Sequence, residues 1–359
     1  MPYLTARAEV FRFNIDLWRE YTWSIGPDGY TLTDPTGRTC NEREVGAVYE
    51  RKVMFNPPTI DTPAGGSPEA WLRDEVFRIW AGIKDLAFGS GKLALIHPSP
   101  TGNWYKMRQM RVAKKYFPVL RWEMLHGVTP RLRGDVVAKT NGGLSLGNNA
   151  LFHVTRLRPE QADPHFPWFL QQAGDAAVEV TVAYIAGRCF ASSMSRKNMK
   201  GEDSRVACAD GTADWQPYTL TPDEHYAVSA LMRETGLSFA RLDFLRIHGK
   251  LHFLELNPNG QFGWIDLRDE RGMLTAIADE IMRVHDLNLP PLSAPVPLRH
   301  FCSLPPDSGK SALFSRSPQN RKRKTPGLRS DILRTLACLL GISLLAFLAV
   351  TALLTFCGA

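Results

Sequence analysis

The first 290 residues of this 359-residue chain alternate short apolar runs with turns made by Pro, Gly and Asn, and a few longer stretches have helical periodicity. Those stretches place an apolar residue every three to four positions, which predicts four helices, at 67–87, 103–116, 221–236 and 268–287. Ser67 before Pro68 is a typical helix start, and Gly236 is a typical helix end.

Other short runs are rich in β-branched and aromatic residues, which favours strands. They lie at 117–125, 135–140 and 149–157, and the segment 177–194 has the pattern of a two-stranded hairpin. A small glycine-rich loop at 142–148 separates two of these strands. Helices and strands in this mixed order predict an α+β or α/β protein.

The stretch 242–266 reads LDFLRIHGKLHFLELNPNGQFGWID and contains the least expected pattern of the chain. Two apolar runs flank His248 and Gly249, which is the spacing of two antiparallel strands joined by a tight turn. Each run also contains an acid, Asp243 in the first and Glu255 in the second. Carboxylates at positions that would otherwise pack in a core need a chemical reason.

Asp243 and Glu255 can face each other as a cross-strand pair on one side of this hairpin. Two carboxylates held so close repel each other unless a cation lies between them. Asn257, two residues beyond Glu255, adds a neutral oxygen ligand on the same side. Arg241, two residues before Asp243, shares this side and is placed to meet a terminal phosphate. Three oxygen ligands beside phosphate oxygens predict a magnesium site, whereas the alternative is that each acid only faces solvent on a half-exposed strand.

Residues 257–266, NPNGQFGWID, together with RLDFL and GKLHFLEL before them, resemble the metal-binding end of an ATP-grasp ligase. This form of the motif is similar to that of ATP-grasp ribosomal peptide maturases of the microviridin or graspetide type. Weaker similarities precede it in the family's order, from about residue 45: GAVYERKVMFNPP, AWLRDEVFRIWAGI, KMRQMRVAKKYFPVLRW, DVVAKTNGG and FPWFLQQ. The resemblance implies the ATP-grasp fold, in which an N-terminal α/β lobe, a central lobe and a C-terminal lobe clasp ATP.

The resemblance also implies which residues contact the phosphates. Lys106 and Lys139 match the family's two nucleotide lysines, each a point charge for phosphate oxygens. Gly142 and Gly143 match a loop whose backbone N–H groups approach phosphate. The alternatives are a solvated helix lysine for Lys106, an unrelated strand lysine for Lys139 and a plain turn for the two glycines.

Three further residues match the family's contacts to the nucleoside. Gln171 and Gln172 match the segment beside the adenine edge, where backbone groups share the contact, and the alternative is an ordinary loop. Glu179 matches an acid that holds the ribose hydroxyls, and the alternative is a strand glutamate that faces solvent. The resemblance therefore assigns a contact to each part of ATP.

Two arginines that the resemblance would place in this chain are absent. The maturases have an Asp-x-Arg strand where this chain has AVEVTV, and an Asp-Trp-Arg where it has Asp214-Trp215-Gln216. Arg241 is a candidate to replace one phosphate contact. The loss bears on the exact reaction more than on nucleotide binding.

Charge is unevenly distributed along the chain. The formal net charge is +7, but residues 309–359 hold eight basic residues and one acid, which leaves 35 of the 43 basic and 35 of the 36 acidic residues in 1–308. The body of the chain is therefore neutral, and we expect no nucleic-acid partner. With 44% hydrophobic and 22% charged residues, the chain is typical of a globular protein.

Residues 335–359 form an apolar segment directly after the basic cluster. As a helix they would rise about 37 Å, more than the roughly 30 Å of a hydrocarbon core. Basic residues before such a span favour the cytoplasmic side of the membrane. We therefore expect a single-pass C-terminal membrane anchor with the catalytic body in the cytoplasm, and the alternative is a buried core helix. The six scattered cysteines suit reduced thiols, as expected for that compartment.

We divide the chain into four parts on these grounds. They are an N-terminal lobe (1–102), an ATP-grasp domain (103–289), a linker rich in Pro, Ser and basic residues (290–334) and a transmembrane helix (335–359).

Together these features predict a ligase that uses ATP and magnesium, with two ions expected. Transfer of the terminal phosphoryl group converts a carboxylate into an acyl phosphate, which an amine or hydroxyl then attacks. The resemblance implies a ribosomal precursor peptide as substrate, with Asp or Glu side chains joined to Lys, Ser or Thr as lactams or lactones. The alternatives are a ligase that adds an amino acid to a carboxylate and a membrane-tethered nucleotide- or peptide-binding protein without turnover.

Overall fold

The computed structural model describes residues 2–50, 67–95, 104–139, 154–199 and 213–286, apart from positions 6, 164, 198 and 267–269. All of them belong to one unit, Met1–Ser303. The boundaries predicted after residues 102 and 289, and the predicted linker and transmembrane segment, lie outside the described residues. In the part of the chain that is described, no helix is long and apolar enough to cross a membrane.

The elements before the first large sheet are α1 (Pro2–Thr5), η1 (Ile15–Glu20), β1 (Thr22–Gly26), β2 (Gly29–Thr33), β3 (Thr39–Asn41), α2 (Pro68–Gly89) and α4 (Lys106–Ala113). A four-stranded sheet holds β4 (Trp122–Leu125), β5 (Val136–Lys139), β6 (Thr155–Leu157) and β7 (Trp168–Gln172), with η2 (Pro159–Gln161) between the last two. A five-stranded sheet and its helices comprise β8 (Val178–Ile185), β9 (Arg188–Ser195), β10 (Trp215–Tyr218), α6 (Pro222–Thr235), β11 (Phe239–Ile247), β12 (Lys250–Asn257), η3 (Gly263–Ile265) and α7 (Met273–His285).

The N-terminal elements form a small antiparallel sheet, β1-β2-β3, and the long helix α2. Helix α2 begins as the sequence predicts, because the Ser67 side chain accepts a hydrogen bond from the Ala70 N–H at 3.2 Å and a proline follows it. Tyr30 and Leu32 of β2 are buried in one cluster with Ile83 of α2. This packing is what ties the helix to the sheet.

The four-stranded sheet has the order β4-β7-β5-β6, with every pair antiparallel. A buried cluster that includes Val136, Ala138 and Leu170 packs on one face of it. Side chains alternate between the two faces along a strand, so Lys139 at the end of β5 and Gln171 in β7 lie on the opposite face from this cluster. The sheet thus presents two predicted nucleotide residues together.

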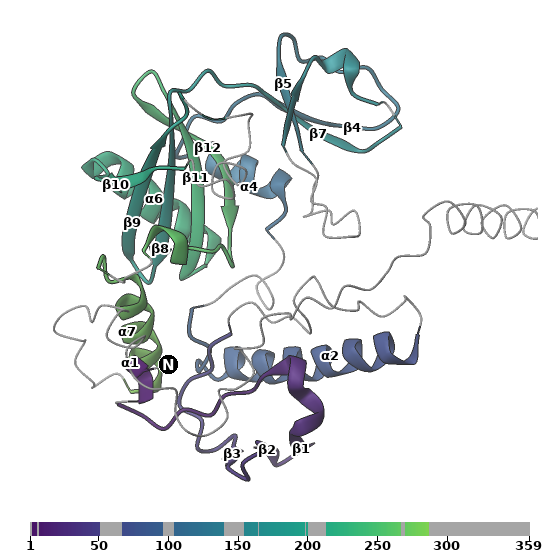
Figure 1. Ribbon diagram of the computed structural model, residues 1–359, viewed down its shortest axis with the longest axis vertical. Helices are drawn as coiled ribbons and strands as arrows, with labels where there is room; N and C mark the ends of the chain where they lie inside the picture. The colour runs from purple at the N-terminus through teal and green to yellow at the C-terminus, as the bar shows by residue number, and fades with distance from the viewer. Residues whose placement is uncertain are drawn as a thin grey trace, which may run out of the picture. The chain divides into compact units, whose positions relative to one another are not determined.

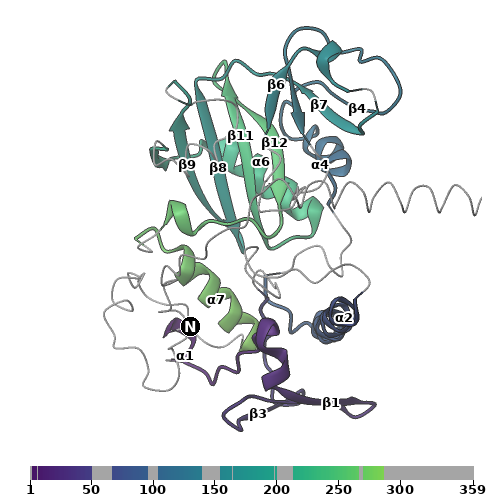
Figure 2. The same ribbon diagram turned by 45° about the vertical axis from the view of Figure 1, so that its right-hand side comes forward.

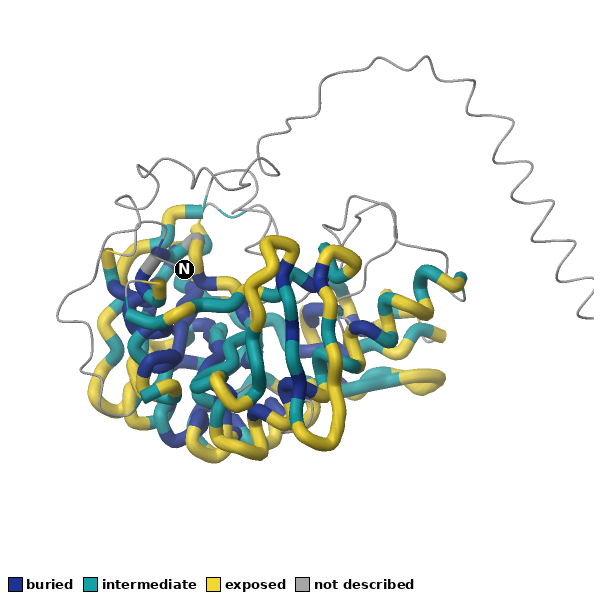
Figure 3. Tube along the Cα trace, turned by 90° about the horizontal axis from the view of Figure 1, so that it is seen from below, coloured by how far each residue is buried: buried dark blue, intermediate teal, exposed yellow. Residues whose placement is uncertain are grey.

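The five-stranded sheet has the order β10-β9-β8-β11-β12; helices α4 and α6 lie beside it, and α7 lies near the lower ends of its strands (Figures 1 and 2). Apolar residues of α4 and α6 pack on one face, in the largest buried cluster of the described residues. Met273 and Ile277 of α7 pack with Ala183 and Ile185 on the other face. Buried residues concentrate within these sheets, while the connecting loops are largely exposed (Figure 3).

Helix α6 has the ends that the sequence predicts. The Thr221 hydroxyl accepts from the Glu224 N–H and the Glu224 carboxylate accepts from the Thr221 N–H, which is a capping box. Gly236 ends the helix in the left-handed region with φ 70°. Helices α4 and α7 are shorter than the predicted stretches 103–116 and 268–287, since the residues after α4 turn toward Pro118 and Gly272 precedes α7 with φ 80°.

The predicted hairpin at 242–256 is confirmed. His248 and Gly249 both have positive φ, 47° and 75°, as a two-residue hairpin turn between β11 and β12 requires. A β-bulge follows in the pairing: Asp243 is opposite Glu255, but Phe244 is opposite Phe253, so Leu254 is the extra residue. The bulge lets Phe253 and Leu256 both enter the core while Glu255 stays on the opposite face.

Candidate functional site

One row of residues crosses four strands of the five-stranded sheet in register. Ser192 of β9 is opposite Thr181 of β8, Thr181 is opposite Asp243 of β11, and Asp243 is opposite Glu255 of β12. Cross-strand partners share a face, so all four side chains are on the side away from the α4 and α6 core. The predicted Asp243–Glu255 pairing is therefore confirmed, and the role of the two acids as metal ligands stays a prediction.

The Asp243 carboxylate is held at both oxygens. The Thr181 hydroxyl donates to Oδ1 at 2.7 Å, and Nη2 of Arg241 donates to Oδ2 at 2.9 Å. Both charged side chains are largely buried, with 13% of Asp243 and 18% of Arg241 exposed. The Asp243 charge and this hydrogen bond raise the pKa of Arg241 although its burial opposes the rise.

Glu255 lies among cations and remains open to solvent. Nζ of Lys106, from the start of α4, donates to Glu255 Oε2 at 3.0 Å, and 33% of the Glu255 side chain is exposed. Loss of hydration on burial acts to raise the pKa of Glu255, but the charges of Lys106 and Lys139 outweigh this effect and lower the pKa to about 2. Glu255 is consequently a fixed negative charge at neutral pH.

Lys139 belongs to the four-stranded sheet and lies near the acids of this row. Burial lowers its pKa to about 8, and the groups whose charges act on it are Glu255, Lys106, Glu179 and Asp243. Four residues that the sequence singled out on separate elements thus lie close enough to Lys139 to influence its protonation. Such convergence of titratable groups is typical of functional sites.

The Lys139 ammonium donates to the Gln171 side-chain oxygen at 3.0 Å. Gln171 is 1% exposed, and its Nε2 has no hydrogen-bond partner in the part of the chain that is described. A buried amide donor without a partner is costly unless a ligand accepts from it. This orphaned donor fits the predicted position beside a nucleotide base.

Glu179 lies on the same face of β8, two residues before Thr181. It is buried, and its carboxylate is 3.4 Å from Nη1 of Arg196, which follows β9. An ion pair between two buried side chains holds both in place. Glu179 therefore does not simply face solvent.

Asn257 ends β12 opposite Arg241, on the face of the two acids. Its Oδ1 accepts from the Asn259 N–H at 3.2 Å, and its carbonyl accepts from the Gly260 N–H, which closes the NPNG turn. A Cβ on Gly260 would lie 2.4 Å from Cβ of Arg241, so only glycine fits there. Nη1 of Arg241 donates to the Gln261 carbonyl at 3.2 Å, so the segment 257–261 both packs against Arg241 and hydrogen-bonds to it.

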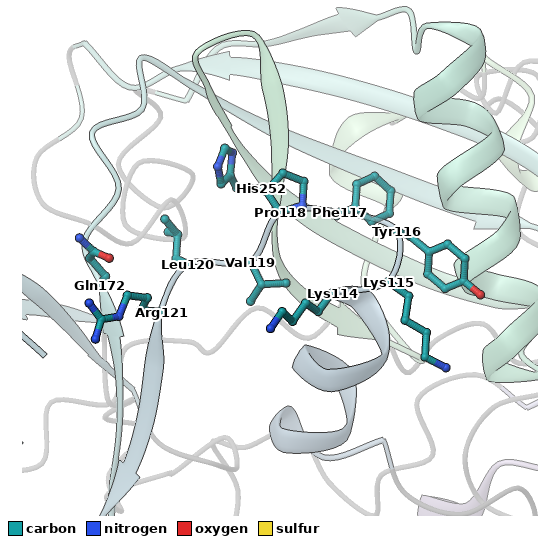
Figure 4. A pocket seen from close by; sticks show the side chains of 10 residues that line it. All are labelled: Lys114, Lys115, Tyr116, Phe117, Pro118, Val119, Leu120, Arg121, Gln172 and His252. Atoms are coloured by element: carbon teal, nitrogen blue, oxygen red, sulfur yellow. The ribbon is translucent and has the colours of Figure 1, made fainter. Parts of the chain in front are cut away.

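Gly142 and Gly143 lie outside the described residues. Gln172 is not in the row: it lines a separate hollow of about 560 Å³ along the segment 114–121 (Figure 4). Lys114, Arg121 and His252 also line this hollow, and none of the other predicted site residues does. Gln172 donates its backbone N–H to the Arg121 carbonyl, and its contact with the base stays a prediction.

Four polar residues in or beside the row were not predicted, namely Ser192, Thr181, Arg196 and Arg271. Arg271 lies before α7 and donates to the Ser192 hydroxyl and the Ala191 carbonyl, both at 2.5 Å. Burial lowers the pKa of Arg271, and within the described residues no carboxylate lies within ion-pair distance of it. The alternation of Val and polar residues in VEVTV was the one signal that could have indicated Thr181.

The donor set suits a hard cation that takes further ligands from a nucleotide. Asp243, Glu255 and Asn257 offer carboxylate and amide oxygens, the ligands that magnesium prefers. Among the described residues, no three His, Cys, Asp or Glu side chains gather as a metal-binding group. A cation here would need phosphate or water oxygens to complete its shell, as is usual for magnesium.

Comparisons with solved structures give matches over most of the chain. The macrocyclase MdnC from Microcystis aeruginosa MRC, bound with precursor peptide MdnA, is 20% identical with a TM-score of 0.63, over 79% of this chain and 94% of that one. A RiPP-associated ATP-grasp ligase from Chryseobacterium gregarium, in complex with ADP and a leader and core peptide, is 18% identical with a TM-score of 0.64, over 82% and 94%.

A third match is the ATP-grasp ligase PsnB complexed with a phosphomimetic variant of its minimal precursor, Mg and ADP. It is 15% identical with a TM-score of 0.61, over 79% of this chain and 93% of that one. No protein-family model matches the sequence, and no curated protein sequence matches it. The shared architecture over nearly the whole length of these proteins shows that this chain has the ATP-grasp fold.

Proposed function

We propose that this chain is an ATP-dependent ligase that activates carboxylates of a ribosomal precursor peptide. The observation that carries the proposal is the row Asp243–Glu255 with Lys106, Lys139 and Arg241 around it. Two acids and three cations in one place suit a metal–triphosphate complex better than they suit a folding role, because burying so many charges is costly. Solved structures of the same fold with ADP, Mg and precursor peptides support it.

In this proposal each part of the site has one task. Asp243, Glu255 and Asn257 hold magnesium, which when bound offsets the charge of the phosphate oxygens. Lys106, Lys139 and Arg241 donate to those oxygens. The other contacts follow the resemblance: Gly142 and Gly143 to phosphate, Gln171 and the backbone of Gln172 to the base, Glu179 to the ribose.

The reaction then needs no protein nucleophile. A carboxylate oxygen of the peptide attacks the terminal phosphorus of ATP, and the bond to the ADP oxygen breaks. An amine or hydroxyl of the same peptide attacks the resulting acyl carbon, loses its proton and expels phosphate. The three cations lower the energy of the first step because they face the oxygens on which charge accumulates.

The test is turnover by the full-length protein with MgATP and a peptide. The probe is a peptide encoded beside this gene by a short reading frame rich in Thr, Lys, Asp and Glu. We expect peptide-dependent ADP release and a loss of one water per ring in the peptide mass. A gain of one residue mass would instead identify an amino-acid ligase. ADP release that no peptide or amino acid stimulates would contradict both.

One observation favours a second candidate, a nucleotide- and peptide-binding protein without turnover. Gln216 occupies the place of an arginine in the maturases, and its amide donates to Asp214 at 2.5 Å. An amide cannot supply the missing cation. Binding of ADP without hydrolysis of ATP under any condition would support this candidate.

We also propose that residues 335–359 anchor the protein in a membrane, with the ligase body in the cytoplasm. The length and apolar composition of the segment support the proposal. Membrane flotation of the full-length protein should be lost when the chain is cut after residue 334. Equal flotation of both forms would contradict it.

A further inference from the structure

Thr181 is a buried hydroxyl at the centre of the row. It is 0% exposed, in a strand whose sequence VEVTV places valines at the alternate positions. Its Oγ1 donates to Asp243 Oδ1 at 2.7 Å, and the Leu242 carbonyl lies farther away, at 3.5 Å. A hydroxyl has one proton to donate, so the shorter contact, to the charged acceptor, holds it.

The two donors to Asp243 differ in what a phosphate would do to them. The guanidinium of Arg241 is positively charged and has several N–H groups. A phosphate that enters the site can therefore take hydrogen bonds from Arg241 in place of Asp243. Thr181 is neutral and buried away from solvent, so its hydroxyl has no reason to exchange Asp243 for another charged acceptor. Thr181 is therefore the constant partner of this carboxylate, and Arg241 is the exchangeable one.

A carboxylate oxygen has two lone pairs, so the bond from Thr181 leaves the second free. The bond comes from β8, which flanks β11 on the side opposite β12, so the lone pair that accepts from Thr181 is on the side away from Glu255. Glu255 lies directly opposite Asp243 on β12. The orientation that Thr181 imposes is thus the one in which Asp243 and Glu255 can share a cation.

We propose that Thr181 is a positioning residue that fixes the Asp243 carboxylate for a divalent cation and thereby sets the magnesium dependence of nucleotide binding. This rests on the nucleotide site of the proposed function, but it requires neither a peptide nor turnover. A partner that orients a metal-binding carboxylate typically contributes 10- to 100-fold to metal affinity, so we expect the loss of the hydroxyl to cost roughly 10-fold.

The experiment is calorimetric titration of the full-length protein with ADP, at a series of magnesium concentrations and in EDTA. Thr181→Val has nearly the shape of the native residue without the hydroxyl, and Thr181→Ser restores the donor. We expect Thr181→Val to raise the magnesium concentration for half-maximal tightening by about 10-fold, with ADP affinity in EDTA unchanged. Thr181→Ser should return most of the native dependence.

Thr235→Val is the matched control, because Thr235 is also buried and its hydroxyl donates to the Met232 carbonyl at 2.7 Å, away from the row. It should lower stability without changing the magnesium dependence. If Thr181→Val does not fold, Thr181→Ala carries the same expectation.

The possible results separate the two proposals. Native magnesium dependence in Thr181→Val, or an equal shift in Thr181→Val, Thr181→Ser and Thr235→Val, would overturn the role of Thr181 and leave the nucleotide site standing. Absence of ADP binding by the native protein at any magnesium concentration would overturn the nucleotide site itself.

Discussion

Two lysine–glutamate pairs in this protein have the same length and different surroundings. Lys84–Glu50 and Lys106–Glu255 are both 3.0 Å ion pairs. The first is sealed in the N-terminal part, with 3% of Lys84 and 7% of Glu50 exposed, and the Trp80 N–H donates to the same carboxylate oxygen at 2.6 Å. The second is open, with 17% of Lys106 and 33% of Glu255 exposed.

The difference shows that an ion pair by itself does not indicate function. At Glu50, Trp80 and Lys84 of α2 donate to one carboxylate oxygen and join that helix to the chain before residue 51. Around Glu255, the charges of Lys139 and Arg241 come from two further strands, in different sheets. Convergence from distant parts of the chain together with access to solvent is what distinguishes the candidate site.

The largest expected effect is on turnover when the open site loses an acid. Glu255→Gln should lower peptide-dependent ADP release by about 1,000-fold, because a metal ligand and the counter-charge of Lys106 are lost together. The matched control is Glu234→Gln, which breaks the surface pair with Lys115 and should leave the rate unchanged. A similar loss in both variants would contradict the assignment of the site.

The next effect is on stability when the sealed pair is broken. Lys84→Met removes the cation that lies 3.0 Å from the buried Glu50 carboxylate, and the free energy of unfolding should fall by about 3 kcal/mol. Lys106→Met should cost about 1 kcal/mol, because Glu255 is open to water. Urea unfolding measures both, and equal losses would remove the distinction between the two pairs.

A smaller loss of stability tests the support of Arg241. Gly260→Ala puts a Cβ 2.4 Å from Cβ of Arg241, and overpacking of this kind should cost about 2 kcal/mol and weaken ADP binding. Gly263→Ala, three residues on, meets no atom within 4 Å and is the control. Thermal unfolding of the two variants should therefore differ, and unaltered stability of Gly260→Ala would be contrary to this packing.

The smallest effect is a pH dependence of nucleotide binding. Burial lowers the pKa of Lys139 from 10.5 to about 8, so its positive charge is lost as pH rises through 8 while the unfolded chain keeps it up to 10.5. ADP affinity should fall by roughly 10-fold between pH 7 and pH 9, as expected for the loss of one phosphate contact. Lys139→Arg should remove the dependence since arginine stays charged, and calorimetry at several pH values measures both.

The same shift affects stability in the opposite direction. Between pH 8 and 10.5 the folded protein binds fewer protons at Lys139 than the unfolded chain does, so the contribution of this group to stability rises with pH in that window. Glu255 has a lowered pKa, and its contribution is present above pH 4.5 and is lost as pH falls toward 2.

Much of the hairpin that holds the two acids follows from local patterns. His248-Gly249 between two apolar runs predicts the turn, but strict alternation from that turn would place Asp243 opposite Leu254. The predicted meeting of Asp243 and Glu255 is confirmed only because the bulge at Leu254 shifts the pairing by one residue. The bulge at Leu254 was not predicted, because HFLEL reads equally well in either register. The bulge decides which residues of β12 enter the core. The bulged register is favoured by packing against α4 and α6, which the local sequence does not record.

The alternatives for individual residues fared unevenly. Lys106 is not a solvated helix lysine, because it is paired with Glu255. Glu179 is buried with Arg196. Gln172 is on a different surface from Gln171, although the two are neighbours in sequence, since alternate strand residues point to opposite faces.

Sequence by itself determined the elements whose signals are local: the capped starts at Ser67 and Thr221, the stop at Gly236 and the turn at His248-Gly249. These depend on contacts among a few consecutive residues, which a short pattern records. Only the tertiary structure decided that Lys139 lies beside the acid row, that Thr181 holds Asp243 and that Arg271 reaches Ser192. Such contacts join residues tens of positions apart, and they exist only once sheet register and packing have placed the strands.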